Sequence, residues 1–157
     1  MNSYLLLKWL HVLSSTVLFG TGIGIAFFKW MADRGDNVHV ARRVNDITVL
    51  ADWLFTTPAV VVQPASGLGL TLMAGYPMNT SWIVASFSLY LLAGACWLPV
   101  VRLQLDMRKL ARRSEADGTP LPPRYKELVQ RWFRLGIPAF SALIIVFWLM
   151  VAKPALW

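Results

Sequence analysis

The sequence contains little from which a disulfide framework or a metal site with several protein ligands could be built. Its 157 residues include one cysteine, Cys96, and two histidines, His11 and His39. One cysteine excludes an internal disulfide, and an isolated imidazole cannot hold zinc without other strong ligands. HExxH and GxSxG motifs are absent from the sequence as well. Metalloprotease and serine-hydrolase chemistry therefore has no motif to support it.

Long polar stretches are also scarce. Hydrophobic residues make up 57% of the sequence, and the mean hydropathy is +0.53. Four stretches, residues 4–28, 47–75, 82–105 and 135–157, are long enough to cross a hydrocarbon core of roughly 30 Å as helices. The first lacks a basic region followed by a small-residue cleavage site, so we expect a retained span. We predict an all-α, four-transmembrane-helix bundle in a single domain over residues 1–157, with a cytoplasmic amphipathic helix before the last span.

Acidic residues are few, and the charges are unevenly placed. The chain has 15 Lys and Arg residues against 8 Asp and Glu residues, which gives a net charge of +7. Apart from Lys8 and Lys153, the basic residues lie in or beside two connections, residues 29–46 and 106–134. By the positive-inside rule we expect both connections to be cytoplasmic and both termini periplasmic, in a bacterial inner membrane. Topology and contact with membrane lipid then explain the basic excess, and no nucleic-acid partner is expected.

Proline and glycine mark two of the predicted spans. Pro58 and Pro64 lie inside the second span, where each removes a backbone hydrogen bond. We predict a kinked helix whose irregular face points into the bundle, because freed carbonyls in lipid need partners from protein or water. Gly20 and Gly24 in the first span have a spacing that lets another helix approach closely. That helix could belong to the same chain, to a second copy in a homodimer or to a larger membrane complex.

The polar groups within the spans can be compared by depth, because a helix rises about 1.5 Å per residue. Tyr4, Lys8, His11 and Ser15 share one face of the first span. Counting the depth of His11 into the other spans reaches Gln63 to Gly67 in the second span, Ser86 to Tyr90 in the third and Met150 in the fourth. Lys8 and Lys153 lie about one turn nearer the outer surface. We therefore expect a polar site without acidic residues in the outer half of the bundle.

Asp52 is the acidic residue that lies well inside a span. An unpaired charge in the membrane interior is costly, and such residues face a partner in the bundle. Arg102 is its nearest basic candidate by the same depth count. We predict an ion pair between Asp52 and Arg102.

Two interpretations of His11 remain open. A lone histidine can serve as an axial ligand of haem b, with Met150 or Lys153 as the candidate ligand opposite it and Ser86 and Gln63 nearby. Alternatively, His11, Lys8 and Gln63 form a polar network between helices in a non-enzymatic scaffold, a complex subunit or a small-solute pathway. Lys8 lies near enough to the helix end to extend its ammonium to the outer interface.

The order of four segments carries a resemblance over nearly the whole chain. These segments are LKWLHVLSSTVLFGTGIGIAFF, TTPAVVVQPASGLGL, SWIVASFSLY and RLGIPAFSALIIVFWLMVAKP. In this order they resemble a family of predicted bacterial inner-membrane proteins and, more distantly, the haem-containing HemJ-type protoporphyrinogen oxidases. The motif positions that match those oxidases are Lys8, Leu10 and His11; Thr57, Pro58, Ala59 and Gly67; and Lys153 with Pro154.

The oxidase pattern departs from this sequence at the start of the third span. There the oxidases have a tryptophan-x-histidine-x-lysine motif, whereas this chain has Trp82, Val84 and Ser86. In the oxidases that lysine is implicated, with the first-span histidine, in haem binding and activity. The resemblance thus implies the four-helix architecture, haem b and a ligand role for His11, and it leaves open whether the chain is an oxidoreductase. It does not imply porphyrinogen oxidation, because the expected lysine is Ser86.

Overall fold

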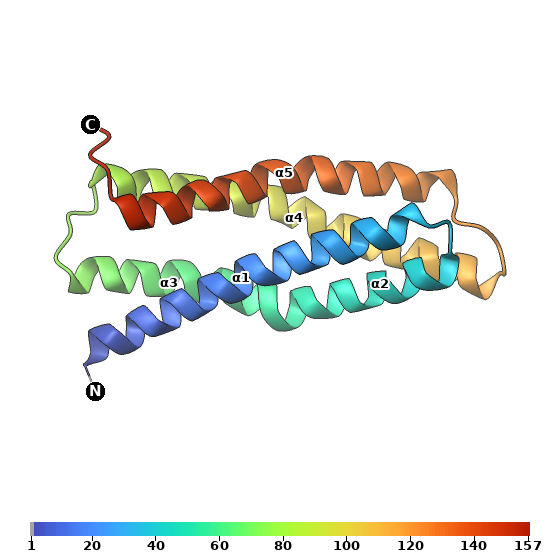
Figure 1. The fold of residues 1–157 in the computed structure, drawn as a ribbon, viewed down its shortest axis with the longest axis horizontal. Helices are drawn as coiled ribbons and strands as arrows, with labels where there is room; N and C mark the ends of the chain where they lie inside the picture. The colour runs from blue at the N-terminus through green and yellow to red at the C-terminus, as the bar shows by residue number, and fades with distance from the viewer. Residues whose placement is uncertain (1) are drawn as a thin grey trace.

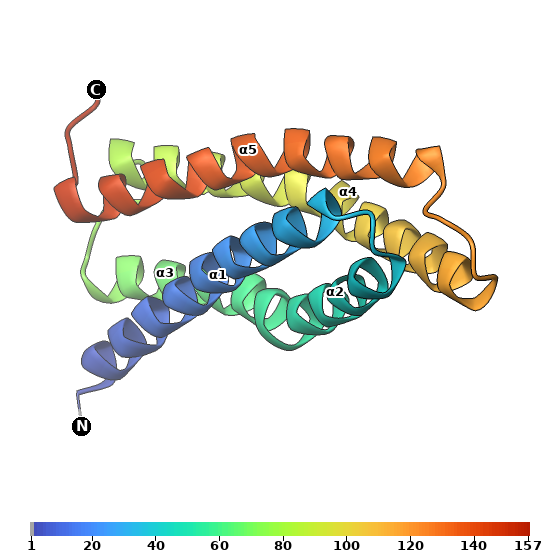
Figure 2. The same ribbon diagram turned by 45° about the vertical axis from the view of Figure 1, so that its right-hand side comes forward.

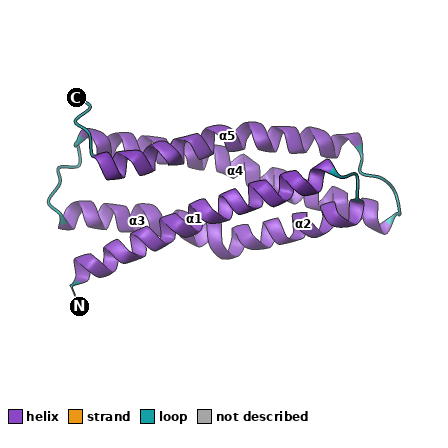
Figure 3. Ribbon diagram, viewed as in Figure 1, coloured by secondary structure: helices purple, strands orange, loops and turns teal. Residues whose placement is uncertain are grey.

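The computed structural model describes residues 2–157, and their regular structure is helical throughout, which confirms the predicted all-α class (Figure 3). The elements in chain order are α1 (Ser3–Arg34), α2 (Val38–Ala51), the π-helical turn η1 (Asp52–Thr56), α3 (Thr57–Met73), α4 (Ser81–Ala116) and α5 (Pro123–Ala152).

Local sequence signals set the ends of these helices. The Asn2 side chain accepts a hydrogen bond from the Tyr4 amide at the start of α1, and Asn37 accepts one from the Val40 amide at the start of α2. Gly75 after α3 and Gly118 after α4 have positive φ values of 71° and 62°. A residue without a Cβ adopts this left-handed conformation at little cost, so both glycines end their helices.

The helices run back and forth along one long axis (Figure 1). Both termini and the α3–α4 turn lie at one end of the bundle, here called the terminal end. The α1–α2 and α4–α5 connections lie at the opposite end, here called the basic end. Helix α4 packs along α5, α1 packs against α2 and α3, and α2 packs against α4. Figure 2 shows α1 crossing beside the bend where α2 gives way to α3.

Four helical segments in residues 2–157 are long and apolar enough to cross a membrane: Ser3–Arg34, Val38–Met73, Ser81–Ala116 and Pro123–Ala152. Their outward faces carry large apolar side chains. Leu91 and Leu98 on α4 are 71% and 64% exposed, and Ile137 on α5 is 65% exposed. Such faces are unfavourable in water and suit a lipid environment.

The helices extend further at the basic end than the predicted spans do. Residues 29–46, predicted as a connection, contain only a short non-helical turn between α1 and α2. Residues 106–134 include the end of α4 and the start of α5. Their apolar faces explain this extension, because Ala41, Met107, Ala111 and Leu128 pack together in a buried core. The predicted amphipathic helix is therefore continuous with the last span as the first turns of α5.

The irregular segment between α2 and α3 confirms the predicted distortion of the second span. The Thr57 amide donates to the Asp52 carbonyl, five residues back, instead of to the residue four back. Pro58 follows immediately, and its ring would clash with a carbonyl in a regular turn. The widened π turn accommodates this proline.

Pro64 leaves a second backbone group without its helical partner, because it has no amide to bond the Val60 carbonyl. The Tyr90 hydroxyl of α4 donates to that carbonyl at 2.8 Å. The irregular face of α3 thus points into the bundle at this position, as predicted, and a neighbouring helix supplies the missing donor.

Close helix approach occurs at different glycines from those that the sequence indicated. A Cβ added to Gly20 would meet no described atom within 4 Å, and one on Gly24 would meet only Phe28 of its own helix. On α3, a Cβ on Gly67 would lie 3.1 Å from His11 Cε1, and one on Gly69 would lie 2.8 Å from Leu7 Cδ2. The α1–α3 contact therefore depends on α3 glycines, and a contact of Gly20 and Gly24 with a second chain stays a prediction.

Candidate functional site

A cavity of about 520 Å³ occupies the half of the bundle nearer the terminal end. Residues from α1, α3, α4 and α5 line it, together with Tyr76 of the α3–α4 turn and Lys153. Pockets of this size bind small molecules and cofactors. The five residues that the sequence predicted as a site all line this cavity: His11, Gln63, Ser86, Met150 and Lys153.

His11 connects α1 to α3 through both nitrogens of its ring. Its Nδ1 atom lies 2.9 Å from Ser66 Oγ, and its Nε2 atom lies 3.2 Å from Gln63 Nε2. The Ser66 hydroxyl donates its one proton to the backbone, with the Val62 carbonyl 2.6 Å away. Ser66 Oγ must therefore accept from His11, which assigns the proton of the neutral imidazole to Nδ1.

The orientation of Gln63 agrees with this tautomer. Its Oε1 atom lies beside the Ser14 hydroxyl, which is also 3.0 Å from the His11 carbonyl, and its amide nitrogen faces His11 Nε2 at 3.2 Å. An amide nitrogen can only donate, so His11 Nε2 is the acceptor and carries a lone pair. His11 thus presents the nitrogen that metal-bound histidines commonly use, while the other nitrogen is held by a hydroxyl.

Gly67 makes room for the imidazole. The His11 ring lies over the backbone of α3 at this residue, and a Cβ there would lie 3.1, 3.6 and 3.9 Å from three ring atoms. The 3.1 Å contact is tighter than most Cβ contacts, so any side chain at residue 67 would push the ring away. Gly67, which matches a glycine of the oxidase motif, thus has a steric role in this structure.

Lysines lie near the mouth of the cavity. Lys8 lines the cavity from α1, and Lys153 follows α5 in a left-handed conformation with φ of 45°. The Lys153 ammonium lies 3.4 Å from the Tyr76 hydroxyl and 5.7 Å from the centre of the Trp82 ring. No acidic residue is among the described residues that line the cavity, so its net charge is positive.

Ser86 and Met150 line the cavity in different ways. The Ser86 side chain is buried, and its hydroxyl donates to the Trp82 carbonyl of its own helix at 2.7 Å. Among residues 2–157 no hydrogen bond joins Ser86 to His11, although both line the same cavity. Met150 packs beside Trp82 and Leu149 in a small apolar cluster. Its thioether is a candidate ligand for a soft or borderline metal centre.

A comparison with family models places the chain in a membrane protein family. A family described as predicted integral membrane protein (DUF2269) matches residues 5–154. The chain belongs to this family. No curated protein and no solved structure matches it. The chain is thus an integral membrane protein, and its resemblance to HemJ-type oxidases stays a prediction.

The ion pair predicted between Asp52 and Arg102 is not formed in the described chain. Asp52 accepts a hydrogen bond from Thr56 Oγ1 at 2.7 Å, and the buried Gln104 of α4 lies beside it. Arg102 is exposed and lines a groove between α4 and α5. Counting depth found the correct level of α4, but it did not give the rotation of the helix. Residues 102 and 104 lie about 200° apart around the helix axis, so Gln104 faces Asp52 while Arg102 points away from it.

A buried polar cluster near the basic end was missed by the sequence analysis. Lys29 is fully buried, and its ammonium lies 3.0 Å from Asp33 Oδ2 and 3.1 Å from Asn45 Oδ1. The Tyr125 hydroxyl donates to Asp33 Oδ1 at 2.7 Å and accepts from Asn45 Nδ2 at 2.7 Å. The i, i+4 spacing of Lys29 and Asp33 was an available signal, but both residues fell in a predicted loop.

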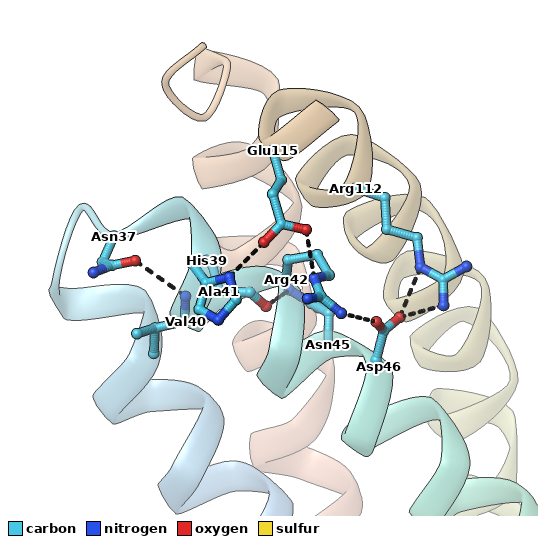
Figure 4. A network of polar contacts seen from close by, with 9 residues as sticks. All are labelled: Asn37, His39, Val40, Ala41, Arg42, Asn45, Asp46, Arg112 and Glu115. Carbon is cyan, nitrogen blue, oxygen red and sulfur yellow. Dashed lines mark hydrogen bonds and ion pairs between the residues drawn. The ribbon is translucent and has the colours of Figure 1, made fainter. Parts of the chain in front are cut away.

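A second polar network joins α2 to the end of α4 (Figure 4). Asp46 accepts from Arg42 at 3.1 Å and from Arg112 at 2.8 Å, and Glu115 contacts Arg42 and His39 at 2.7 and 2.6 Å. His39 is 71% exposed, which agrees with its interpretation as a surface residue. The network is solvated and lies far along the bundle from the cavity, so we assign it a structural role.

Proposed function

We propose that this integral membrane protein binds haem b in the cavity at its terminal end, with His11 as an axial ligand. The observation that carries the proposal is the state of His11. His11 lines a cavity of about 520 Å³, and its hydrogen-bond partners assign the proton of the neutral imidazole to Nδ1 and the lone pair to Nε2, which faces the Gln63 amide at 3.2 Å. Ser66 holds the Nδ1 proton, as the hydrogen-bond partners of metal-bound histidines do.

The remaining lining fits the rest of a haem group. Haem b is a flat, largely apolar ring with two carboxylates at one edge. The walls offer aromatic and aliphatic side chains such as Phe19, Phe87 and Val146, and Lys8 and Lys153 supply positive charge for the carboxylates. Bound haem would supply one-electron redox chemistry. The other residues that would hold the iron are Met150 or the neutral amine of Lys153; in the second case Lys8 alone would supply the charge for the carboxylates.

In this proposal each protein group has a limited task. Ser66 fixes the imidazole orientation, and Gln63 gives up the 3.2 Å contact that its amide makes with Nε2. The apolar walls exclude water, which tunes the potential of a buried redox centre. The proposal stops short of porphyrinogen oxidation, because Ser86 stands where the oxidases have a lysine.

We place the protein in a bacterial inner membrane with its termini in the periplasm. The basic residues other than Lys8 and Lys153 support this orientation, because they gather toward the end where α1 meets α2 and α4 meets α5. The positive-inside rule then makes that end cytoplasmic. The cavity would then lie in the periplasmic half of the bundle.

Haem titration of the detergent-purified protein tests the ligand role of His11. We expect a saturable Soret band for the wild type, and in His11→Ala a loss of the band or a Kd at least about tenfold higher. His39→Ala is the matched control, because His39 is the other histidine and is exposed at the far end. A folded wild type that binds no haem, or a His11→Ala variant with an unchanged Soret band, would overturn the proposal.

One observation favours the alternative of a cofactor-free scaffold or small-solute pathway. Both ring nitrogens of His11 already have partners on α3, so the imidazole joins two helices without a cofactor. Each such interhelical hydrogen bond in a membrane contributes about 0.6–2 kcal/mol. This alternative predicts that His11→Ala lowers thermal stability while no haem binds to either protein. An unchanged Tm in His11→Ala would rule it out.

A further inference from the structure

A groove between α4 and α5 near the basic end gathers arginines. It has a volume of about 450 Å³ and is lined by Pro99, Arg102, Leu103, Arg131, Arg134 and Leu135. Arg131 and Arg134 are three residues apart, so they share a face of α5, and Arg102 approaches from α4. Half of the lining residues therefore carry a positive charge, and the others are apolar.

These three arginines lack protein counter-charges. Several cations at this end of the molecule are paired: Lys29 with Asp33, Arg42 with Asp46 and Glu115, and Arg112 with Asp46. Arg34, Arg43, Arg108 and Arg113 have no ion pair among the described residues, but none of them lines the groove. None of the ion pairs found in residues 2–157 includes Arg102, Arg131 or Arg134. Like charges that line one groove repel each other, so an anion bound among them would stabilise the arrangement.

The position of the groove indicates which anion this is. Arg102 lies near the end of the predicted third span, and Arg131 and Arg134 lie just before the fourth, so the arginines are at the expected level of the lipid headgroups. Leu103 and Leu135 continue the groove, and Leu98 and Ile137 extend the exposed apolar surface of α4 and α5 toward the hydrocarbon region. A ligand that matches this surface has an anionic phosphate head and long apolar chains.

We infer that this groove is a binding site for an anionic phospholipid, whose phosphodiester is held by Arg102, Arg131 and Arg134. Guanidinium groups bind phosphate oxygens through paired, charge-assisted hydrogen bonds. Basic pockets between transmembrane helices bind anionic lipid headgroups in this manner. The site is separate from the haem cavity, and its assignment does not depend on haem binding.

Native mass spectrometry of the detergent-purified protein with defined lipids tests this assignment. We expect wild type to retain phosphatidylglycerol at least about tenfold more tightly than phosphatidylcholine of the same chain length. The variant Arg131→Gln/Arg134→Gln should lose most of this preference. The variant Arg43→Gln/Arg113→Gln removes the same charge from exposed residues outside the groove and should keep the preference within about twofold.

Three outcomes would overturn the assignment. Equal retention of the two lipids by wild type would contradict the assignment. This comparison needs no variant, so the test holds even if the groove variant fails to fold. An equal loss in both double variants would indicate a general charge effect. If inorganic phosphate, added at the concentration of the lipid, displaces phosphatidylglycerol, the groove binds the phosphate group alone and the acyl chains contribute nothing.

Discussion

At the scale of single residues, the chemistry of His11 is set by two neighbours that contribute one hydrogen bond each. Ser66 Oγ accepts a hydrogen bond from Nδ1–H, and the Gln63 amide donates one to Nε2. Exchanging these two roles would place the proton on Nε2 and remove the lone pair that could bind iron. The serine and the glutamine therefore determine which ring nitrogen carries the lone pair.

Gly67 should be sensitive to substitution, because the His11 ring fills the space of its missing side chain. We predict that Gly67→Ala lowers the free energy of unfolding by about 1–3 kcal/mol, as expected for overpacking, and weakens any haem binding. Gly20→Ala is the matched control, because its Cβ would meet no described atom within 4 Å. Thermal or denaturant unfolding of both variants in detergent measures the difference. Equal stabilities for the two variants would contradict the packing of His11 on α3.

The residues of the cavity show what a sequence can and cannot predict at this scale. Depth counting placed His11, Gln63, Ser86, Met150 and Lys153 on one cavity, because four antiparallel helices of known rise fix the level of each residue. The predicted range from Gln63 to Gly67 includes Ser66, but depth alone did not single out this serine as the partner of His11. The rotation of each helix about its axis decides which side chains meet, and weak amphipathicity in lipid-facing helices leaves that rotation undetermined.

At the scale of helices, polar side chains of one helix hydrogen-bond free backbone groups or pair with charged side chains of another helix, and these contacts help to hold the bundle together. Tyr90 of α4 bonds the α3 carbonyl that Pro64 leaves free. Lys29 and Asp33 of α1 meet Asn45 of α2 and Tyr125 of α5. Each of these contacts replaces a partner that water would supply in a soluble protein.

The Tyr90 contact predicts a coupling between two substitutions. Tyr90→Phe removes the hydroxyl that bonds Val60, so we expect a loss of about 1–2 kcal/mol in the free energy of unfolding. Pro64→Ala restores a backbone donor for the same carbonyl. In the Pro64→Ala background, Tyr90→Phe should therefore cost less than half as much. Additive effects in this double-mutant cycle would show that the tyrosine does not substitute for the missing amide.

The Lys29 cluster predicts a larger cost when one charge is removed. Lys29→Met leaves the buried Asp33 carboxylate without its cation, and we expect a loss of about 3–5 kcal/mol or failure to fold. Lys29→Met/Asp33→Leu removes both charges, so it should recover much of that stability. Unfolding curves of the two variants in the same detergent provide the comparison. A double variant as unstable as Lys29→Met would mean that the ion pair itself is needed.

The sequence predicted the elements better than it predicted their contacts. Apolar length identified four membrane-crossing helices, and Pro58 and Pro64 identified the irregular one. The charged residues 29–46 were assigned to a loop, because basic residues mark cytoplasmic connections. In the structure these residues lie on helices whose apolar faces form a core with Ala41, Met107 and Tyr125. The positive-inside rule depends on the positions of charged residues alone, so it cannot predict such packing.

At the scale of the whole molecule, the two ends of the bundle have different tasks. The basic end holds the buried apolar core, the Lys29 cluster and the network of Figure 4. The terminal end contains the cavity, with helices from both halves of the chain around it. The buried core and the polar contacts thus lie at one end, and the candidate site lies at the other.

The orientation of these ends in the membrane can be measured with single cysteines in a Cys96→Ser background. Asn79→Cys lies in the α3–α4 turn, and Thr119→Cys lies in the α4–α5 connection, and both residues are exposed. We predict that a membrane-impermeant maleimide labels Asn79→Cys in intact spheroplasts and labels Thr119→Cys only after permeabilisation. The opposite pattern would place the cavity on the cytoplasmic side.

The central claim is that His11 binds the iron of haem b, and chemical rescue tests it most directly. The measurement is the Soret absorbance of detergent-purified wild type and His11→Gly, each with equal haem and with or without free imidazole. We predict a band for wild type, its loss in His11→Gly, and its return when imidazole fills the space of the missing ring. A band in His11→Gly that is as strong as in wild type without imidazole, or no band in folded wild type, would contradict the account.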